Sequence, residues 1–138
     1  MSDAIGGGCH CGAVRYEATG DPGFSAHCQC TDCRKFSGSA HKSFMMMPAE
    51  GFTVTGQVSA YDYAGGSGAV ITHHFCPACG AGLFSKHAGV AGAVFLYASA
   101  LDDPERFRPT MAVYTKSAPS WDHLDPGLTT HEEGSRKR

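Results

Sequence analysis

The chain has 138 residues, of which 42% are hydrophobic, and its formal net charge is −2. This length suffices for one domain with a modest core and is too short for two independent ones. Binding to nucleic acid or an anionic membrane is favoured by an excess of positive charge, which this chain lacks, so we expect neither as a partner. No apolar run approaches the roughly 20 residues of a membrane span, and residues 1–6 lack the features of a secretory signal. We therefore expect a cytoplasmic protein.

Short strands separated by glycine-rich turns are predicted along most of the chain. Residues 13–18 alternate between apolar and polar side chains, as a half-buried strand does, and a short strand at 24–27 leads into a group of cysteines. One helical turn with acidic residues at its start is predicted at 101–107. Further strands are predicted at 39–47, 52–55, 58–63, 69–75, 83–85, 93–97 and 111–114. This rhythm indicates a mainly β fold.

Three consecutive glycines, Gly6 to Gly8, precede the first cysteines. No helix or Walker lysine follows them, which argues against a phosphate-binding loop. We expect them to let the backbone curl around a metal ion, where a positive φ is often needed.

The seven cysteines point to metal binding. An odd number cannot pair completely into disulfides within one chain, and the cytosol keeps thiols reduced. All seven lie in three groups in which one or two residues separate neighbouring cysteines, spacings that suit chelation better than long-range bridges. The groups are Cys9 with Cys11, Cys28 with Cys30 and Cys33, and Cys76 with Cys79.

Cys76 and Cys79, with two residues between them and a glycine after, are typical of a zinc knuckle. A closed structural site needs two more ligands, and Cys9 and Cys11 are the natural partners. Alternatively, two thiols of the central group complete this site, which would leave Cys9 and Cys11 without a metal.

The central group, Cys28, Cys30 and Cys33, supplies three thiolates and leaves one tetrahedral position to be filled. A histidine could close it; the candidates are His27, His41, His73 and His74. If the position stays open, water or a substrate thiol can bind there and lose its proton.

Two cations, Arg34 and Lys35, directly follow the central group. Their simplest role is to compensate the net negative charge of a metal held by three thiolates. The functional alternative is that Arg34 binds a substrate carboxylate, for which its planar fork is suited.

These motifs, in this order, resemble the family of glutathione-dependent formaldehyde-activating enzymes. The resemblance rests on Gly8 to Val14, on Cys28 to Lys35 with Gly38, on Phe75 to Gly80, and on Leu101 to Pro104 with Trp121. It implies a β-tent fold of two small antiparallel sheets stapled by zinc. Residues 1–125 would form this single zinc-binding domain, and residues 126–138 a C-terminal tail that is partly disordered.

The resemblance also implies two zinc ions per chain. A structural zinc would be held by Cys9, Cys11, Cys76 and Cys79, and a catalytic zinc by Cys28, Cys30 and Cys33. The implied reaction joins glutathione to formaldehyde as S-hydroxymethylglutathione, a carbon–sulfur lyase reaction written in reverse. The partners would thus be a thiol and an aldehyde. One departure is that many family members have a histidine where this chain has Met111, Ala112 and Val113.

Three other classes compete with this enzyme. A non-catalytic zinc-binding interaction or chaperone module on the same fold is the main alternative. A methionine sulfoxide reductase needs a free nucleophilic cysteine, and every cysteine here is already assigned to a metal site. A nucleic-acid-binding zinc ribbon is disfavoured by the net charge of −2.

Overall fold

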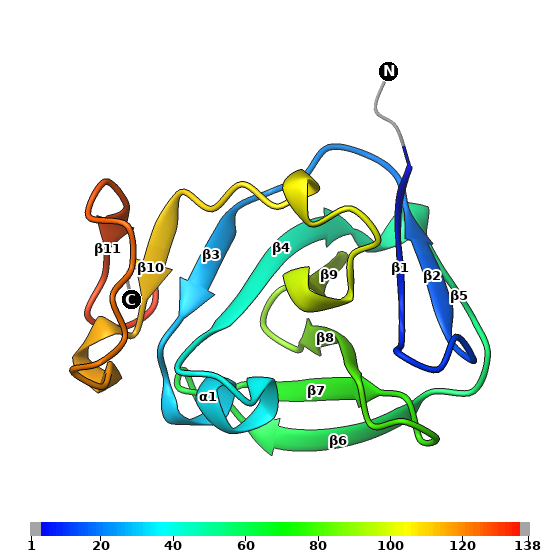
Figure 1. Cartoon of the computed structure of the whole chain (residues 1–138), viewed down its shortest axis with the longest axis horizontal. Helices are drawn as coiled ribbons and strands as arrows, with labels where there is room; N and C mark the ends of the chain where they lie inside the picture. Colours follow the sequence, from blue (N-terminus) through cyan, green and yellow to red (C-terminus); the bar gives the residue numbers. More distant parts are fainter. Residues whose placement is uncertain (1–3, 136–138) are drawn as a thin grey trace.

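The computed structural model describes residues 4–135, and in it the predicted mainly β architecture of two sheets is confirmed. The smaller sheet is antiparallel and has the strand order β1-β2-β5 (Figure 1). Its strands are β1 (Ile5–Gly8), β2 (Arg15–Ala18) and β5 (Phe52–Thr55).

The larger sheet has eight strands in the order β11-β10-β3-β4-β9-β8-β7-β6. They are β3 (Ser25–Cys28), β4 (Lys42–Pro48), β6 (Ser59–Ala64), β7 (Val70–Phe75), β8 (Gly82–His87), β9 (Ala93–Tyr97), β10 (Met111–Val113) and β11 (Thr129–Thr130). Most pairs are antiparallel as expected, but β10 pairs in parallel with both β3 and β11. The pairing with β3 is parallel because the segment between β9 and β10 crosses past β4 and β3 before β10 joins the sheet (Figure 1), and residues 114–128 make a second crossover between β10 and β11.

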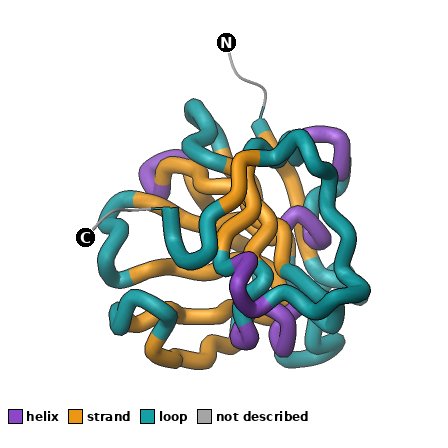
Figure 2. Tube along the Cα trace, turned by 90° about the vertical axis from the view of Figure 1, so that its left-hand side faces the viewer, coloured by secondary structure: helices purple, strands orange, loops and turns teal. Residues whose placement is uncertain are grey.

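The helical segments are short and separate, and strands run through the middle of the molecule (Figure 2). The one described α-helix is α1 (Thr31–Ser37). The 3₁₀ turns are η1 (Ala49–Gly51), η2 (Ala98–Ala100), η3 (Pro104–Arg106) and η4 (Thr115–Ser117). The turn η3 confirms the predicted helical turn, and the Asp103 side chain caps it by accepting from the N–H of Glu105 at 3.1 Å. No described helix is long and apolar enough to cross a membrane.

The expectation that Gly6 to Gly8 curl around a metal is wrong. They form the strand β1, and none of the three has a positive φ. The reason for glycine is close packing: a Cβ at Gly7 would lie 2.4 Å from the Tyr16 ring and 2.6 Å from the carbonyl oxygen of Ala100. The left-handed glycine near the first cysteines is Gly12, with φ of 85°.

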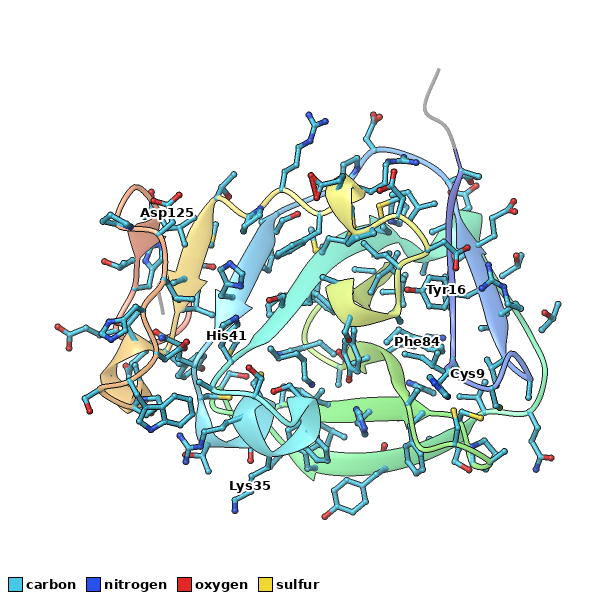
Figure 3. All side chains as sticks on the ribbon, in the orientation of Figure 1. Cys9, Tyr16, Lys35, His41, Phe84 and Asp125 are labelled. Carbon is cyan, nitrogen blue, oxygen red and sulfur yellow. The ribbon has the colours of Figure 1, made fainter. Side chains whose placement is uncertain are left out.

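The core fills the space between the two sheets. Tyr16 of the smaller sheet and Phe84 of the larger one point toward each other there, with ring centroids 6.3 Å apart (Figure 3). Apolar side chains surround them, and the largest fully buried ones are those of Val14, Met47, Leu83, Val94 and Leu96. Cys9 and Cys76 belong to the same buried core, which therefore reaches the two turns that carry them.

The C-terminal segment continues the larger sheet. The N–H of His131 donates to the carbonyl of Ala112 at 2.9 Å, and the N–H of Tyr114 donates to the carbonyl of Glu133 at 3.0 Å. The described part of the predicted tail therefore lies against β10. Its boundary at residue 125 stays a prediction, and residues 136–138 lie outside the described part of the chain.

Candidate metal centres

Four cysteines from two distant turns meet in one cluster. The Sγ atoms of Cys9, Cys11, Cys76 and Cys79 all lie within 4.8 Å of one another. Cys9 and Cys11 come from the turn between β1 and β2, and Cys76 and Cys79 from the turn between β7 and β8. The Sγ–Sγ distance is 3.6 Å from Cys9 to Cys11 and 3.8 Å from Cys11 to Cys76. These are the four residues that the sequence groups as a closed site, and we call them the four-cysteine cluster.

Backbone N–H groups of both turns point at the sulfur atoms. Val14 donates to Cys9 Sγ at 3.2 Å, and Ala78 donates to Cys76 Sγ at 3.4 Å. The hydrogen bond from Val14 lowers the pKa of Cys9. Backbone hydrogen bonds, first from Ala81, lower the pKa of Cys79 to about 6. The turns thus stabilise thiolates, the form of cysteine that binds metal.

The second cluster contains Cys28, Cys30 and Cys33, whose Sγ atoms also lie within 4.8 Å of one another. We call it the three-cysteine cluster. Cys28 is the last residue of β3, and Cys30 is the N-cap of α1, with its Sγ accepting from the N–H of Cys33 at 3.3 Å. The two-residue spacing therefore spans one capped helical turn, which places both sulfurs at the start of α1 beside the end of β3.

The helix α1 itself was not predicted from the sequence. It has no fully buried residue and only seven residues, so it shows no apolar periodicity. Two signals were present in the sequence: Asp32 in the first turn, and Gly38 at the C-cap, which has a φ of 69°.

The three thiols of this cluster share negative charge. Contacts with Cys28 and Cys33 lower the pKa of Cys30, whereas the contact with Cys30 raises the pKa of Cys28, and contacts with both other thiols raise that of Cys33. Ionising all three together requires a nearby cation. A divalent metal bound by the three sulfurs would meet this need.

No histidine completes the three-cysteine cluster within the described residues. No His, Asp or Glu ligand atom joins the three sulfurs within the same 4.8 Å. His27 Nδ1 lies 2.7 Å from Ser43 Oγ, and His41 Nδ1 lies 2.9 Å from Asp122. The other two candidates are held elsewhere: His73 Nδ1 lies 2.7 Å from the Tyr97 hydroxyl, and the His74 ring stacks on Phe84.

A buried lysine, which sequence reasoning missed, accompanies the three-cysteine cluster. Lys42 is 5% exposed and lies directly opposite Cys28 in the antiparallel β3–β4 pair. Side chains at such positions share a face of the sheet with Cβ atoms about 5 Å apart. Burial lowers the pKa of Lys42, and the charges of Cys33, Cys28 and Cys30 oppose that shift. The signal in the sequence was a lone lysine at the start of a strand that is mostly apolar.

Aromatic rings enclose the Lys42 ammonium. Its Nζ lies 4.3 Å from the centroid of the Tyr97 ring and 5.4 Å from that of Phe36 in α1. Phe36 packs in turn against His73 and Tyr63, at centroid distances of 4.4 and 5.0 Å. These rings form an aromatic wall around Lys42, which lies opposite Cys28 of the three-cysteine cluster.

The two cations singled out from the sequence differ in their surroundings. Arg34 is half-buried, and its Nη1 donates to the backbone carbonyl of Ser117 at 3.5 Å. Lys35 is exposed and points away from the body of the protein (Figure 3). Arg34 has guanidinium donors beyond the one that Ser117 receives. Its role toward a substrate stays a prediction.

Both clusters have donor sets that suit zinc. Zn–S bonds of about 2.3 Å place neighbouring sulfurs of a tetrahedron about 3.8 Å apart. The measured Sγ–Sγ distances of 3.6 and 3.8 Å in the four-cysteine cluster agree with this spacing. The three-cysteine cluster offers three such ligands, with Cys28 buried and Cys30 and Cys33 half-buried.

The comparisons with known proteins agree with the motifs. A family model described as "Glutathione-dependent formaldehyde-activating enzyme" matches residues 4–117. The chain is also similar to a crystal structure of a Rhodobacter sphaeroides protein, with a TM-score of 0.57 and 19% sequence identity over 91% of this chain and 98% of that chain. At this identity the likeness shows the fold alone. No curated protein matches the chain.

Proposed function

Because the chain belongs to the family of glutathione-dependent formaldehyde-activating enzymes, we propose that it is a zinc-dependent carbon–sulfur lyase that joins a thiol to an aldehyde. Glutathione and formaldehyde are the substrates that the family description suggests. The proposal includes two zinc ions per chain, one at each cysteine cluster.

The observation that carries the proposal is the difference between the two clusters. Four sulfurs gather in one and three in the other, and no further ligand atom of a described residue joins the three. A zinc ion at Cys28, Cys30 and Cys33 would supply one free coordination position, at which a thiol binds as thiolate. The four-cysteine cluster would leave no such position and would act in folding.

The residues around the three-cysteine cluster would favour the reaction. The rings of Phe36 and Tyr97 enclose the ammonium of Lys42, and this buried cation balances negative charge there. A thiol with an ordinary pKa near 8.5 is mostly protonated at pH 7, so a site that favours the thiolate raises the concentration of the attacking form. Holding sulfur and carbonyl together adds the advantage of proximity.

We further propose that Arg34 binds a carboxylate of the thiol substrate. Glutathione carries carboxylates, and a guanidinium binds a carboxylate with two parallel hydrogen bonds. Arg34 lies in α1, directly after Cys33, and its hydrogen bond to the Ser117 carbonyl would hold the guanidinium in place there.

The test replaces zinc by Co²⁺ and adds glutathione. A thiol entering the coordination shell intensifies the sulfur-to-metal charge-transfer bands, and we expect this response at millimolar glutathione. A Cys30→Ser variant should lose both the response and any catalysis above the spontaneous rate, while the metal of the four-cysteine cluster stays bound. A cobalt spectrum that ignores thiols would mean a closed site, and the non-catalytic binding or chaperone module would then replace the enzyme.

A further inference from the structure

Lys42 is a buried cation, and the negative groups that act on it are the three-cysteine cluster, first, and Asp32 of α1. Its Cα is opposite that of Cys28, and the charges of all three cysteines of the cluster act on it. Burying a lone ammonium is costly, and a side chain that bears this cost usually faces a partner of opposite charge. For Lys42 that partner is the set of thiolates.

The Lys42 ammonium is also fixed in direction. Its Nζ donates a hydrogen bond to the Tyr97 hydroxyl at 3.2 Å, and this hydroxyl is its hydrogen-bond partner among the described residues. Because the Tyr97 oxygen accepts from Lys42, its own O–H is left to donate to His73 Nδ1, 2.7 Å away. Desolvation lowers the pKa of His73 to about 4, so this ring is neutral near pH 7 and can accept. An ammonium has three N–H donors, and the hydrogen bond to Tyr97 uses one of them. Lys42 can therefore donate to a further acceptor.

We propose that Lys42 binds the carbonyl oxygen of the aldehyde and stabilises the negative charge that develops on this oxygen as the thiolate adds. This inference rests on the proposed function and assigns the electrophilic role in it to a residue. Lys35 is exposed and Arg34 reaches toward Ser117, whereas Lys42 is buried on the face of the sheet that carries Cys28.

The step balances without any further reactant. A lone pair of the thiolate sulfur forms the new C–S bond, and the π pair of the carbonyl moves onto the oxygen. That oxygen then takes up one proton, which replaces the proton that the thiol lost on binding. Negative charge therefore moves from sulfur to oxygen within the site, and a fixed, desolvated ammonium stabilises this charge better than water does.

The test measures whether Lys42 recognises a hydroxyl near the position of the new oxygen. The probes are 2-mercaptoethanol, whose hydroxyl lies one carbon further from the sulfur than that of the adduct, and 1-propanethiol, which has a methyl group in place of this hydroxyl. Both are titrated into the cobalt-loaded protein, and the charge-transfer bands give two dissociation constants. Their ratio expresses the preference for the hydroxyl.

In a Lys42→Met variant we expect the preference for 2-mercaptoethanol to fall by about tenfold, because a hydrogen bond to a charged group is lost. Lys35→Met is the matched control: it removes one cation from the same part of the chain at an exposed position and should leave the ratio unchanged. If Lys42→Met fails to bind cobalt, Lys42→Gln is compared in its place: it keeps a donor and removes the charge, so the preference should fall, though by less than tenfold; an unchanged ratio would contradict the proposal.

Two results would overturn the proposal and separate it from the proposed function. If Lys42→Met weakens both thiols by the same factor, Lys42 is only a counterion of the cluster, and the enzyme proposal stands without it. If the wild-type cobalt spectrum responds to neither thiol, the site is closed and both proposals fail.

Discussion

Gly12 and Gly80 occupy equivalent positions in the two turns of the four-cysteine cluster. Each directly follows the second cysteine of its pair, and their φ values are 85° and 78°. A Cβ would meet nothing within 4 Å at either position, so glycine is needed there for its backbone conformation and not for space. Two turns far apart in the sequence thus place a glycine in the left-handed conformation directly after their second cysteine.

Replacing either glycine by alanine should therefore weaken both the fold and the metal site. We expect Gly12→Ala and Gly80→Ala each to cost about 1–2 kcal/mol, because a left-handed conformation strains any residue with a Cβ. Thermal unfolding and chelator competition measure the two effects. Gly68→Ala is the control, since Gly68 has a φ of 90° in equally open space away from both clusters. It should lose similar stability and keep the metal affinity; equal loss of affinity would contradict a local role for Gly12 and Gly80.

Removing a sulfur of the four-cysteine cluster should unfold the domain. Cys76 is fully buried, and a structural zinc contributes on the order of 10 kcal/mol to the folding of small metallo-domains. Cys76→Ser should abolish the cooperative melting transition, whereas Cys30→Ser should stay folded. Metal analysis of the wild type should find up to two zinc ions per chain, one of them much harder to chelate. An unchanged melting temperature in Cys76→Ser would contradict the structural assignment.

Changing Arg34 tests the proposed carboxylate contact. Arg34→Lys should weaken glutathione binding by about 1–3 kcal/mol, because the bidentate hydrogen bond is lost. A thiol without a carboxylate, such as 2-mercaptoethanol, should bind the variant as it binds the wild type. Cobalt titration measures both affinities. If the variant binds both thiols more weakly and also melts at a lower temperature, the contact of Arg34 with Ser117 is structural, and the proposed contact with the carboxylate is excluded.

Acid should destabilise the protein through His73. Its pKa is about 4 when folded, lowered by desolvation, against about 6.5 when unfolded, so protonation favours the unfolded chain. The stability it contributes is full above pH 6.5 and is lost as the pH falls toward 4, an effect of about 1–3 kcal/mol. His73→Phe keeps a ring beside Phe36 and should show a shallower fall in denaturant-measured stability. Parallel profiles for the two proteins would contradict this role of His73.

The parts of this structure that local sequence patterns determine were predictable. The strand at 93–97 was predicted with the bounds that β9 has, because a short apolar run between turns suits a buried strand. The grouping of cysteines into four and three followed from the coordination number of zinc and the knuckle spacing, and the structure brings together those same sets.

What the sequence could not show depends on contacts between distant segments. The ammonium of Lys42 donates to the hydroxyl of Tyr97, 55 residues away, and the residues next to Lys42 in the sequence do not identify this partner. The parallel pairing of β10 with β3 likewise depends on how the chain crosses between strands. The helix α1 was missed for a local reason: its cap is a cysteine, which is not among the usual capping residues.

The order of the larger sheet has a consequence for how the molecule comes apart. Within the described sheet, β9 alone joins the half that carries Cys28 to the half that leads into Cys76. Its register with β4 contains five residue pairs, but that with β8 contains only two, Phe84 with Leu96 and Ser85 with Phe95. The pairing of β8 with β9 is therefore the weakest connection between the two halves. The four-cysteine cluster supplies a second connection, because it joins the turn after β7 to the turn between β1 and β2 of the smaller sheet. Chelation should therefore first speed amide hydrogen exchange in β6, β7 and β8 as one cooperative unit, while β3, β4 and β9 remain protected.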